Sequence, residues 1–109
     1  MTLSSWIDVY LDHLRVERAL SPATLSAYGT DLARLARHLE ERGIDDVRAI
    51  DGGHVSSLVA ATETSAKSLA RHLSAIRGFF KFLLRERAIE KDPTSLVDRP
   101  KIGRRLPKV

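Results

Sequence analysis

The sequence of 109 residues contains no cysteine, and only 6% of its residues are aromatic. The lack of cysteine excludes disulfide bonds and thiolate metal sites, and it is typical of proteins from a reducing compartment. No apolar segment approaches the ~20 residues that span a bilayer, and the N-terminal residues lack the basic start and apolar stretch of a signal peptide. We therefore expect a soluble protein of the cytoplasm with one modest hydrophobic core and no membrane partner.

Patterns that would indicate a metal or nucleotide site are also missing. No two of the four histidines are three or four residues apart, the spacing that would place a pair of histidine ligands on one side of a helix. Gly52 and Gly53 lack the longer glycine pattern and the following lysine of a phosphate-binding loop. We therefore expect no metal and no cofactor.

Helical periodicity runs through most of the chain. Apolar residues recur at spacings of three and four, and no stretch keeps the period of two that a strand requires. The sequence predicts an all-α fold, a compact bundle of four main helices plus a short C-terminal helical turn. These elements are expected at about residues 3–20, 22–43, 51–60, 64–87 and 92–97.

Capping residues mark the helix ends. Ser21 supplies an N-cap oxygen, and Pro22 occupies the first helical position, where the missing N–H costs nothing. Gly43 is expected to close the second helix in a left-handed conformation. The remaining N-caps are predicted to be Thr2 or Ser4, then Asp51, then Thr62 or Thr64, and finally Asp92 before Pro93.

Charge is divided unevenly along the chain. Residues 1–63 carry six Lys/Arg against ten Asp/Glu, whereas residues 64–109 carry twelve against four, so the net charges are −4 and +8. We expect one domain over residues 1–97, followed by a basic linker over residues 98–109. A field of this kind attracts polyanions, and nucleic acid fits it better than acidic lipid because no basic helix here has the pattern of a membrane-lying helix.

The predicted fourth helix has one apolar side and one basic side. Its inward stripe consists of Leu69, Leu73, Ile76, Phe80 and Leu83. Its outward side has no acidic residue before Glu86 and consists of Lys67, Arg71, Ser74, Gly78, Lys81 and Arg85, flanked by Ser65, Ser68 and Arg77. A helix without a partner usually mixes both signs of charge for support from ion pairs one turn apart, so we expect a negatively charged partner.

The pattern alone leaves alternatives open. The basic side could be an ordinary solvated face, or it could bind duplex DNA or an acidic protein. Arg104 and Arg105 in the linker could contact DNA or belong to an unstructured basic end. Gly78 indicates either a close backbone approach or a neighbouring helix.

Taken together, four segments in this order resemble the N-terminal core-binding domain of tyrosine site-specific recombinases, most closely the bacterial Xer type of the phage integrase family. The segments are WIDVYLDHLRVERALS, LSPATLSAYGTDLARLARHLEERG, SAKSLARHLSAIRGFFKFLLRERAIEKDPTSLV and PKIGRRLPK. The resemblance implies a SAM-like helical domain that forms one half of a clamp on double-stranded DNA, with the second and fourth helices crossing in the major groove. It further implies site-specific recombination, in chromosome dimer resolution or element integration.

In the family, the catalytic half carries the tyrosine nucleophile and follows the PKIGRRLPK segment. Tyr10 and Tyr28 do not match its motif, so we expect no catalytic residue and no enzymatic activity in this fragment. The resemblance implies a tetramer of full-length protomers on DNA, in the bacterial cytoplasm and on the nucleoid when bound, whereas the fragment alone is expected to be a monomer. A helical domain that docks an acidic protein partner is the alternative function.

Family contacts, carried over position by position, fall on Thr24, Ser26, Ala27 and Thr30 of the second helix and on Lys67, Ser68, Arg71 and Ser74 of the fourth. Only about eight helical residues fit within a major groove roughly 12 Å wide, so residues 65–74 fit and Lys81 must reach phosphates. Arg71 is expected to read a guanine edge with its planar fork, while Lys67 and Arg77 contact phosphates. The full set of expected DNA contacts adds Ser65, Arg77, Lys81, Arg104 and Arg105.

Overall fold

The computed structural model describes residues 1–95 as four α-helices and one short 3₁₀ helix, with no strand in that part of the chain. The elements are α1 (Leu3–Glu17), α2 (Pro22–Glu40), η1 (Val47–Ala49), α3 (Gly52–Ala61) and α4 (Ala66–Arg85). The all-α bundle predicted from the periodicity is therefore confirmed. Within these 95 residues, none of the helices combines the length and apolar character needed to cross a bilayer.

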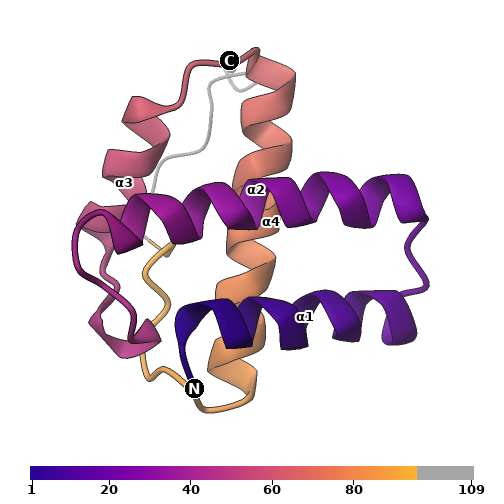
Figure 1. The fold of residues 1–109 in the computed structure, drawn as a ribbon, viewed down its shortest axis with the longest axis horizontal. Helices are drawn as coiled ribbons and strands as arrows, with labels where there is room; N and C mark the ends of the chain where they lie inside the picture. Colours follow the sequence, from indigo (N-terminus) through magenta and orange to yellow (C-terminus); the bar gives the residue numbers. More distant parts are fainter. Residues whose placement is uncertain (96–109) are drawn as a thin grey trace, which may run out of the picture.

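The helices are arranged as an antiparallel pair with a third helix crossing it (Figure 1). α1 and α2 run side by side in opposite directions, and α4 passes across both of them. The first half of α4 lies against α2 and its second half lies against α1, while α3 packs beside the C-terminal end of α2. The crossing of α2 and α4 brings together the two helices that the family resemblance assigns to DNA.

Local capping sets the helix boundaries largely as the sequence predicts. The side chains of Thr2, Ser21 and Asp51 each accept a hydrogen bond from the backbone N–H three residues later, which satisfies one unpaired donor of the first turn. Gly43 has a φ of +74°, the left-handed conformation expected of it. The N–H of Ile44 donates to the Leu39 carbonyl at 2.9 Å, so the chain folds back over the end of α2.

The predicted start of the fourth helix is wrong by one residue or more. Ser65 is its N-cap, because the Ser65 hydroxyl accepts a hydrogen bond from the N–H of Ser68 at 3.1 Å. Thr62 instead closes α3, where its backbone N–H donates to Val59 and its hydroxyl donates to the Leu58 carbonyl at 2.8 Å. Three hydroxyl residues within four positions are equivalent as sequence signals, and the path of the chain between the two helices chooses among them.

The buried side of α4 is wider than one stripe, since two helices cover it. Leu73, Ile76, Phe80 and Leu83 are buried as predicted, and His72, Ala75, Phe79 and Phe82 are buried beside them. Phe82 packs against the rings of Trp6 and Tyr10 from α1. Leu69, near the start of the helix, is only half-buried.

Gly78 faces α1, so its predicted place on the outward side is wrong. A Cβ atom added there would lie 2.4 Å from the Tyr10 hydroxyl oxygen but 3.5 Å from Cζ of the same ring. Tyr10 is 5% exposed, and burial raises its pKa to about 12. Of the two alternatives for Gly78, the neighbouring helix is therefore confirmed, and the neighbour is a side chain.

After α4, the described chain ends in a turn. Asp92 Oδ1 accepts hydrogen bonds from the Thr94 N–H at 2.8 Å and from the Thr94 hydroxyl at 2.6 Å, and the Ser95 N–H donates to the Asp92 carbonyl. These bonds hold Asp92 at the start of the turn over residues 93–95. The rest of the predicted turn, Leu96 and Val97, the domain boundary at residue 97 and the linker lie outside the described residues.

Candidate nucleic-acid interface

The expected DNA contacts of α2 lie along its N-terminal half. Ser26 and Thr30 are exposed, and Thr24 and Ala27 are half-buried. The Thr30 hydroxyl donates to the Ser26 carbonyl at 3.1 Å, and Thr24 forms hydrogen bonds with the Ser21 hydroxyl that caps the helix. Because the hydroxyl hydrogen of Thr30 is already used within the helix, this side chain meets a partner mainly through its oxygen lone pair.

The expected contacts of α4 lie along its first three turns. Lys67, Arg71 and Ser74 are exposed, and Ser68 is half-buried. Ser65 is exposed but serves as the N-cap of the helix. In the described part of the chain, Lys67 forms no ion pair with a carboxylate.

Arg71 is held at the helix crossing by an acidic residue of α2. Its Nε donates to Asp31 Oδ2 at 2.9 Å, and its Nη2 donates to Asp31 Oδ1 at 3.0 Å. The Asp31 side chain is fully buried, whereas the Arg71 side chain is 43% exposed. The outward side of α4 has no acidic residue of its own before Glu86, but Asp31 of α2, 40 residues away in sequence, faces Arg71 across the crossing.

This ion pair gathers the candidate contacts into one surface. Ala27 lies one helical turn before Asp31 and Thr30 lies one turn after Ala27, while Lys67, Ser68 and Ser74 each lie one turn from Arg71. We call these five residues, with Arg71, the α2/α4 face. Thr24 and Ser26 extend it toward the start of α2, and Lys81 extends it along α4 beyond the eight residues that a groove can hold.

His72 lies directly beneath the α2/α4 face. It is fully buried, and its Nδ1 is 3.5 Å from Asp31 Oδ1, yet neither ring nitrogen forms a hydrogen bond within the described residues. Burial lowers the pKa of His72, the Asp31 carboxylate opposes this shift, and the charges of Arg34 and Arg71 lower the pKa further. The ring is therefore neutral at physiological pH, and Asp31 and Arg71 form the ion pair of the crossing.

Arg77 has a partner inside the domain. Its Nη1 donates to the Thr94 carbonyl at 3.2 Å, and the side chain is half-buried. This bond ties α4 to the segment that follows it, which gives Arg77 a structural contact in addition to the phosphate contact expected from the sequence. Arg104 and Arg105 lie outside the described residues.

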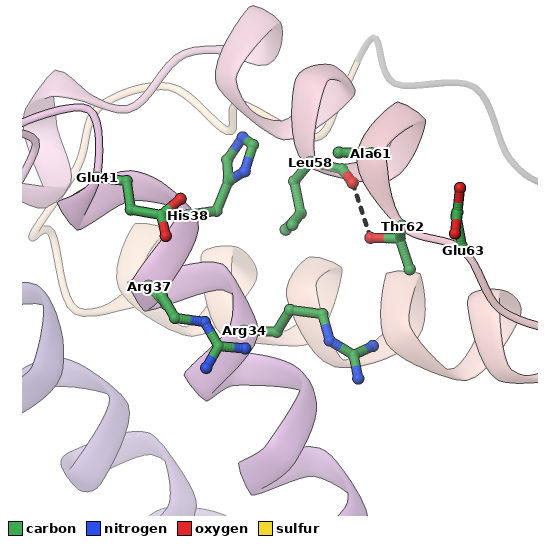
Figure 2. A pocket seen from close by; sticks show the side chains of 8 residues that line it. All are labelled: Arg34, Arg37, His38, Glu41, Leu58, Ala61, Thr62 and Glu63. Atoms are coloured by element: carbon green, nitrogen blue, oxygen red, sulfur yellow. Dashed lines mark hydrogen bonds between the residues drawn. The ribbon is translucent and has the colours of Figure 1, made fainter.

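Arg34 extends the positive surface, although the family resemblance did not assign it to DNA. It lies one turn after Thr30 on α2, and the spacing of Ser26, Thr30 and Arg34 at every fourth position is the signal that could have found it. Arg34 and Arg37 line a pocket of about 300 Å³ between α2 and the end of α3 (Figure 2).

The pocket itself has no net charge that would select an anion. Glu41 and Glu63 line it together with the two arginines, and the hydroxyl of Thr62 on its wall is turned to the Leu58 carbonyl (Figure 2). No group of His, Cys, Asp and Glu residues suited to hold a metal ion occurs within residues 1–95. The pocket is therefore a poorer candidate site for a polyanion than the α2/α4 face with its exposed Lys67 and Arg71.

A family model for the N-terminal SAM-like domain of phage integrases matches residues 7–87, which include all of α2, α3 and α4. The chain belongs to this family. The N-terminal domain of a phage integrase/site-specific recombinase from Haloarcula marismortui has the same fold, with a TM-score of 0.82 over 92% of this chain and 97% of that chain at 18% sequence identity.

Curated relatives of this phage integrase N-terminal domain are tyrosine recombinases. It is 45% identical to tyrosine recombinase XerC of Azotobacter vinelandii over 94% of this chain and 35% of that protein. It is 40% identical to tyrosine recombinase XerD of Mycobacterium tuberculosis over 98% of this chain and 38% of that protein. The SAM-like domain described here therefore spans little more than a third of these recombinases.

Proposed function

We propose that this chain is the DNA-binding half-clamp of a tyrosine recombinase and that it grips duplex DNA through the α2/α4 face. The observation that carries the proposal is the exposed pair Lys67 and Arg71 on the first turns of α4, at the crossing with α2. The surplus of basic residues from Thr64 onward supports it, since a nucleic acid is the polyanion that such a field most often meets. Similarity to XerC and XerD supports DNA as the partner.

In this proposal the first turns of α4 enter the major groove and α2 crosses beside them. Lys67 contacts a phosphate, and its charge is not neutralised by a carboxylate within residues 1–95. Ser68 and Ser74 supply short hydroxyl contacts to phosphates that fix the register of the protein on the duplex, and Thr30 offers its hydroxyl oxygen as an acceptor. Lys81 lies too far along α4 for the same groove and reaches a phosphate at its edge.

The same proposal holds that the fragment binds DNA but does not cleave it. Full-length protomers then carry the catalytic residues elsewhere and assemble as a tetramer at a recombination site, to resolve chromosome dimers or integrate an element. The isolated domain is a monomer, and the protein acts in the bacterial cytoplasm, on the nucleoid when bound. The competing function is docking of an acidic protein on the same face.

An amide chemical-shift titration of the isotope-labelled chain tests the proposal. The ligand is a short duplex with a Xer-type recombination half-site, and the titration is repeated at two salt concentrations. We expect shifts on residues 23–30 and 65–81 that weaken as salt rises, because phosphate contacts release counterions.

The control is a duplex of the same length and scrambled sequence, which should bind through the same face but more weakly. Shifts confined to other surfaces, or no shifts at low salt, would contradict the proposal. In that case an acidic protein becomes the better partner for the α2/α4 face.

A further inference from the structure

Asp31 has a buried carboxylate whose one charged hydrogen-bonding partner in the described chain is Arg71. Both carboxylate oxygens accept from the guanidinium, at 2.9 and 3.0 Å. The carboxylate is 0% exposed, and the facing His72 nitrogen is 3.5 Å away without a hydrogen bond. Such a planar two-bond pair restricts the guanidinium to one orientation.

The pair uses only one edge of the Arg71 guanidinium. A guanidinium has five N–H donors, and Asp31 occupies those on the Nε and Nη2 side. The outer edge keeps one N–H on each Nη in parallel, which is the arrangement that bonds two neighbouring acceptors at once. Because the Arg71 side chain is 43% exposed while Asp31 is buried, the edge that is not bonded lies on the solvent side.

The carboxylate also changes what Arg71 contributes to binding. Hydrogen bonding and charge from Asp31 raise the pKa of Arg71, so the guanidinium remains charged throughout. The buried negative charge offsets most of its long-range attraction for phosphates, unlike that of Lys67. The two outer N–H groups of Arg71 therefore remain at the surface in a fixed direction. Such a pair suits the two acceptors of one base edge better than it suits the evenly spread charge of the DNA phosphates.

We infer that Asp31 is a positioning residue, which fixes Arg71 across the α2/α4 crossing so that its outer edge reads the O6 and N7 acceptors of one guanine in the major groove. The inference rests on the proposed DNA-binding function and adds to it the base and the residue that orients its reader. It also assigns a role to a buried acidic residue directly beneath the basic α2/α4 face, where a negative charge without a role would weaken the attraction for phosphates.

Selection from a library of randomised duplexes tests the inference, with sequencing of the duplexes that the 109-residue chain retains. We expect the unaltered chain to enrich guanine at one position. Asp31→Asn and Asp31→Glu should each lower that enrichment about tenfold, because one removes the charge and the other displaces the fork. Arg71→Lys should do the same, because an ammonium keeps the charge but lacks the two parallel donors.

Two controls separate positioning from general loss of binding or folding. Lys67→Ala should bind all duplexes more weakly and keep the guanine enrichment. Unfolding midpoints of all variants identify any that lose the fold. Asp31→Glu and Arg71→Lys are the variants that should best keep the fold, because each retains an ion pair of opposite charges at the crossing. Arg71→Ala is a poorer probe, since it leaves the buried Asp31 unpaired and destabilises the domain.

The outcomes distinguish this inference from the proposed function. If a folded Asp31→Asn or Asp31→Glu variant keeps full guanine enrichment, Asp31 does not position a reader. If the unaltered chain binds duplexes without any base preference, Arg71 contacts phosphate and the inference fails, while DNA binding stands. If it binds no duplex, the proposed function fails and the inference fails with it.

Discussion

At the residue scale, two exposed cations on α4 have different environments. Lys67 has no carboxylate partner within the described residues, whereas Arg71 shares its charge with the buried Asp31. Helical periodicity places both on one face and cannot separate them. The difference predicts that Lys67 contributes to affinity for any duplex and Arg71 contributes to choice among duplexes.

Replacing Lys67 with alanine should weaken binding to every duplex alike. Loss of one phosphate contact should make the negative slope of log K against log salt shallower by about 0.9. Fluorescence anisotropy with one labelled duplex at several salt concentrations measures this slope. Lys91→Ala is the matched control, because Lys91 is also exposed but lies beyond α4, and an equal change in both variants would argue against a specific role for Lys67.

His72 should make the stability of the domain depend on pH. Its pKa in the folded protein is lowered from 6.5, chiefly by burial, so the unfolded chain binds a proton more readily than the folded one. The stability from the neutral ring is complete above about pH 6.5 and is lost as pH falls toward the folded pKa. The thermal unfolding midpoint should therefore decrease between about pH 7.5 and pH 5.5.

His72→Gln tests the assignment of this dependence, because glutamine is polar but does not titrate. The variant should show a weaker decrease of the midpoint over the same range, with a remainder from His38, whose pKa burial also lowers. An imidazole resonance of His72 that titrates at its ordinary value in the folded protein would show that the ring is not held neutral.

At the element scale, the packing of α1 against α4 depends on one missing side chain. Gly78 allows the Tyr10 ring to lie across α4, with its hydroxyl oxygen too close to the position of an added Cβ for a side chain there. The aromatic rings of Phe79 and Phe82 pack against the same ring, at centroid distances of 5.7 and 5.3 Å. The glycine thus sets how closely the two helices approach, and no local helical signal required it there.

Gly78→Ala should destabilise the domain, and Tyr10→Phe should reverse the effect. The new Cβ would lie 2.4 Å from the hydroxyl oxygen, and overpacking of this kind costs about 1–3 kcal/mol. Without the hydroxyl the nearest ring atom is at 3.5 Å, an ordinary van der Waals distance, and alanine then adds about 1 kcal/mol of helix propensity. Denaturant unfolding of the two single variants and the double variant measures the coupling, and additive effects would contradict the close approach.

At the scale of the whole molecule, the core residues and the positive charges are distributed differently along the chain. The core is built from all four helices, whereas the positive charge lies mainly after Glu63. The acidic first half contributes α1, whose role is to pack against α4, and α2, which contributes Asp31 to the crossing. Folding thus places the basic surface of the second half on a scaffold supplied by the first half.

Removing residues 99–109 should lower DNA affinity without lowering the stability of the domain. This segment carries five Lys/Arg and few apolar side chains, so its removal should leave the unfolding midpoint unchanged while lowering affinity for all duplexes and reducing the salt dependence. Calorimetry and the anisotropy assay, applied to the same truncated chain, measure the two effects. A large loss of thermal stability would show that the segment contributes to the core.

Local signals along the chain predict most of the helices of this domain. Helix type followed from apolar spacing, and the starts of α2 and α3 followed from Ser21 with Pro22 and from Asp51, because capping bonds reach only three residues along the chain. The order of the four segments and their spacing also indicated the family that the comparisons confirm.

The packing of the helices against one another, in contrast, sets which residues of a given helix face remain available to a partner. Asp31 and Arg71 are 40 residues apart, and Tyr10 and Gly78 are on different helices, so neither pairing follows from spacing along one helix. Periodicity reports which side of a helix is apolar, but the crossing of α2 over α4 determines that Arg71 meets an acidic residue and that Lys67 forms no ion pair within residues 1–95. The physical reason is that capping and amphipathicity act within a few residues, whereas ion pairs and close packing depend on distance in space.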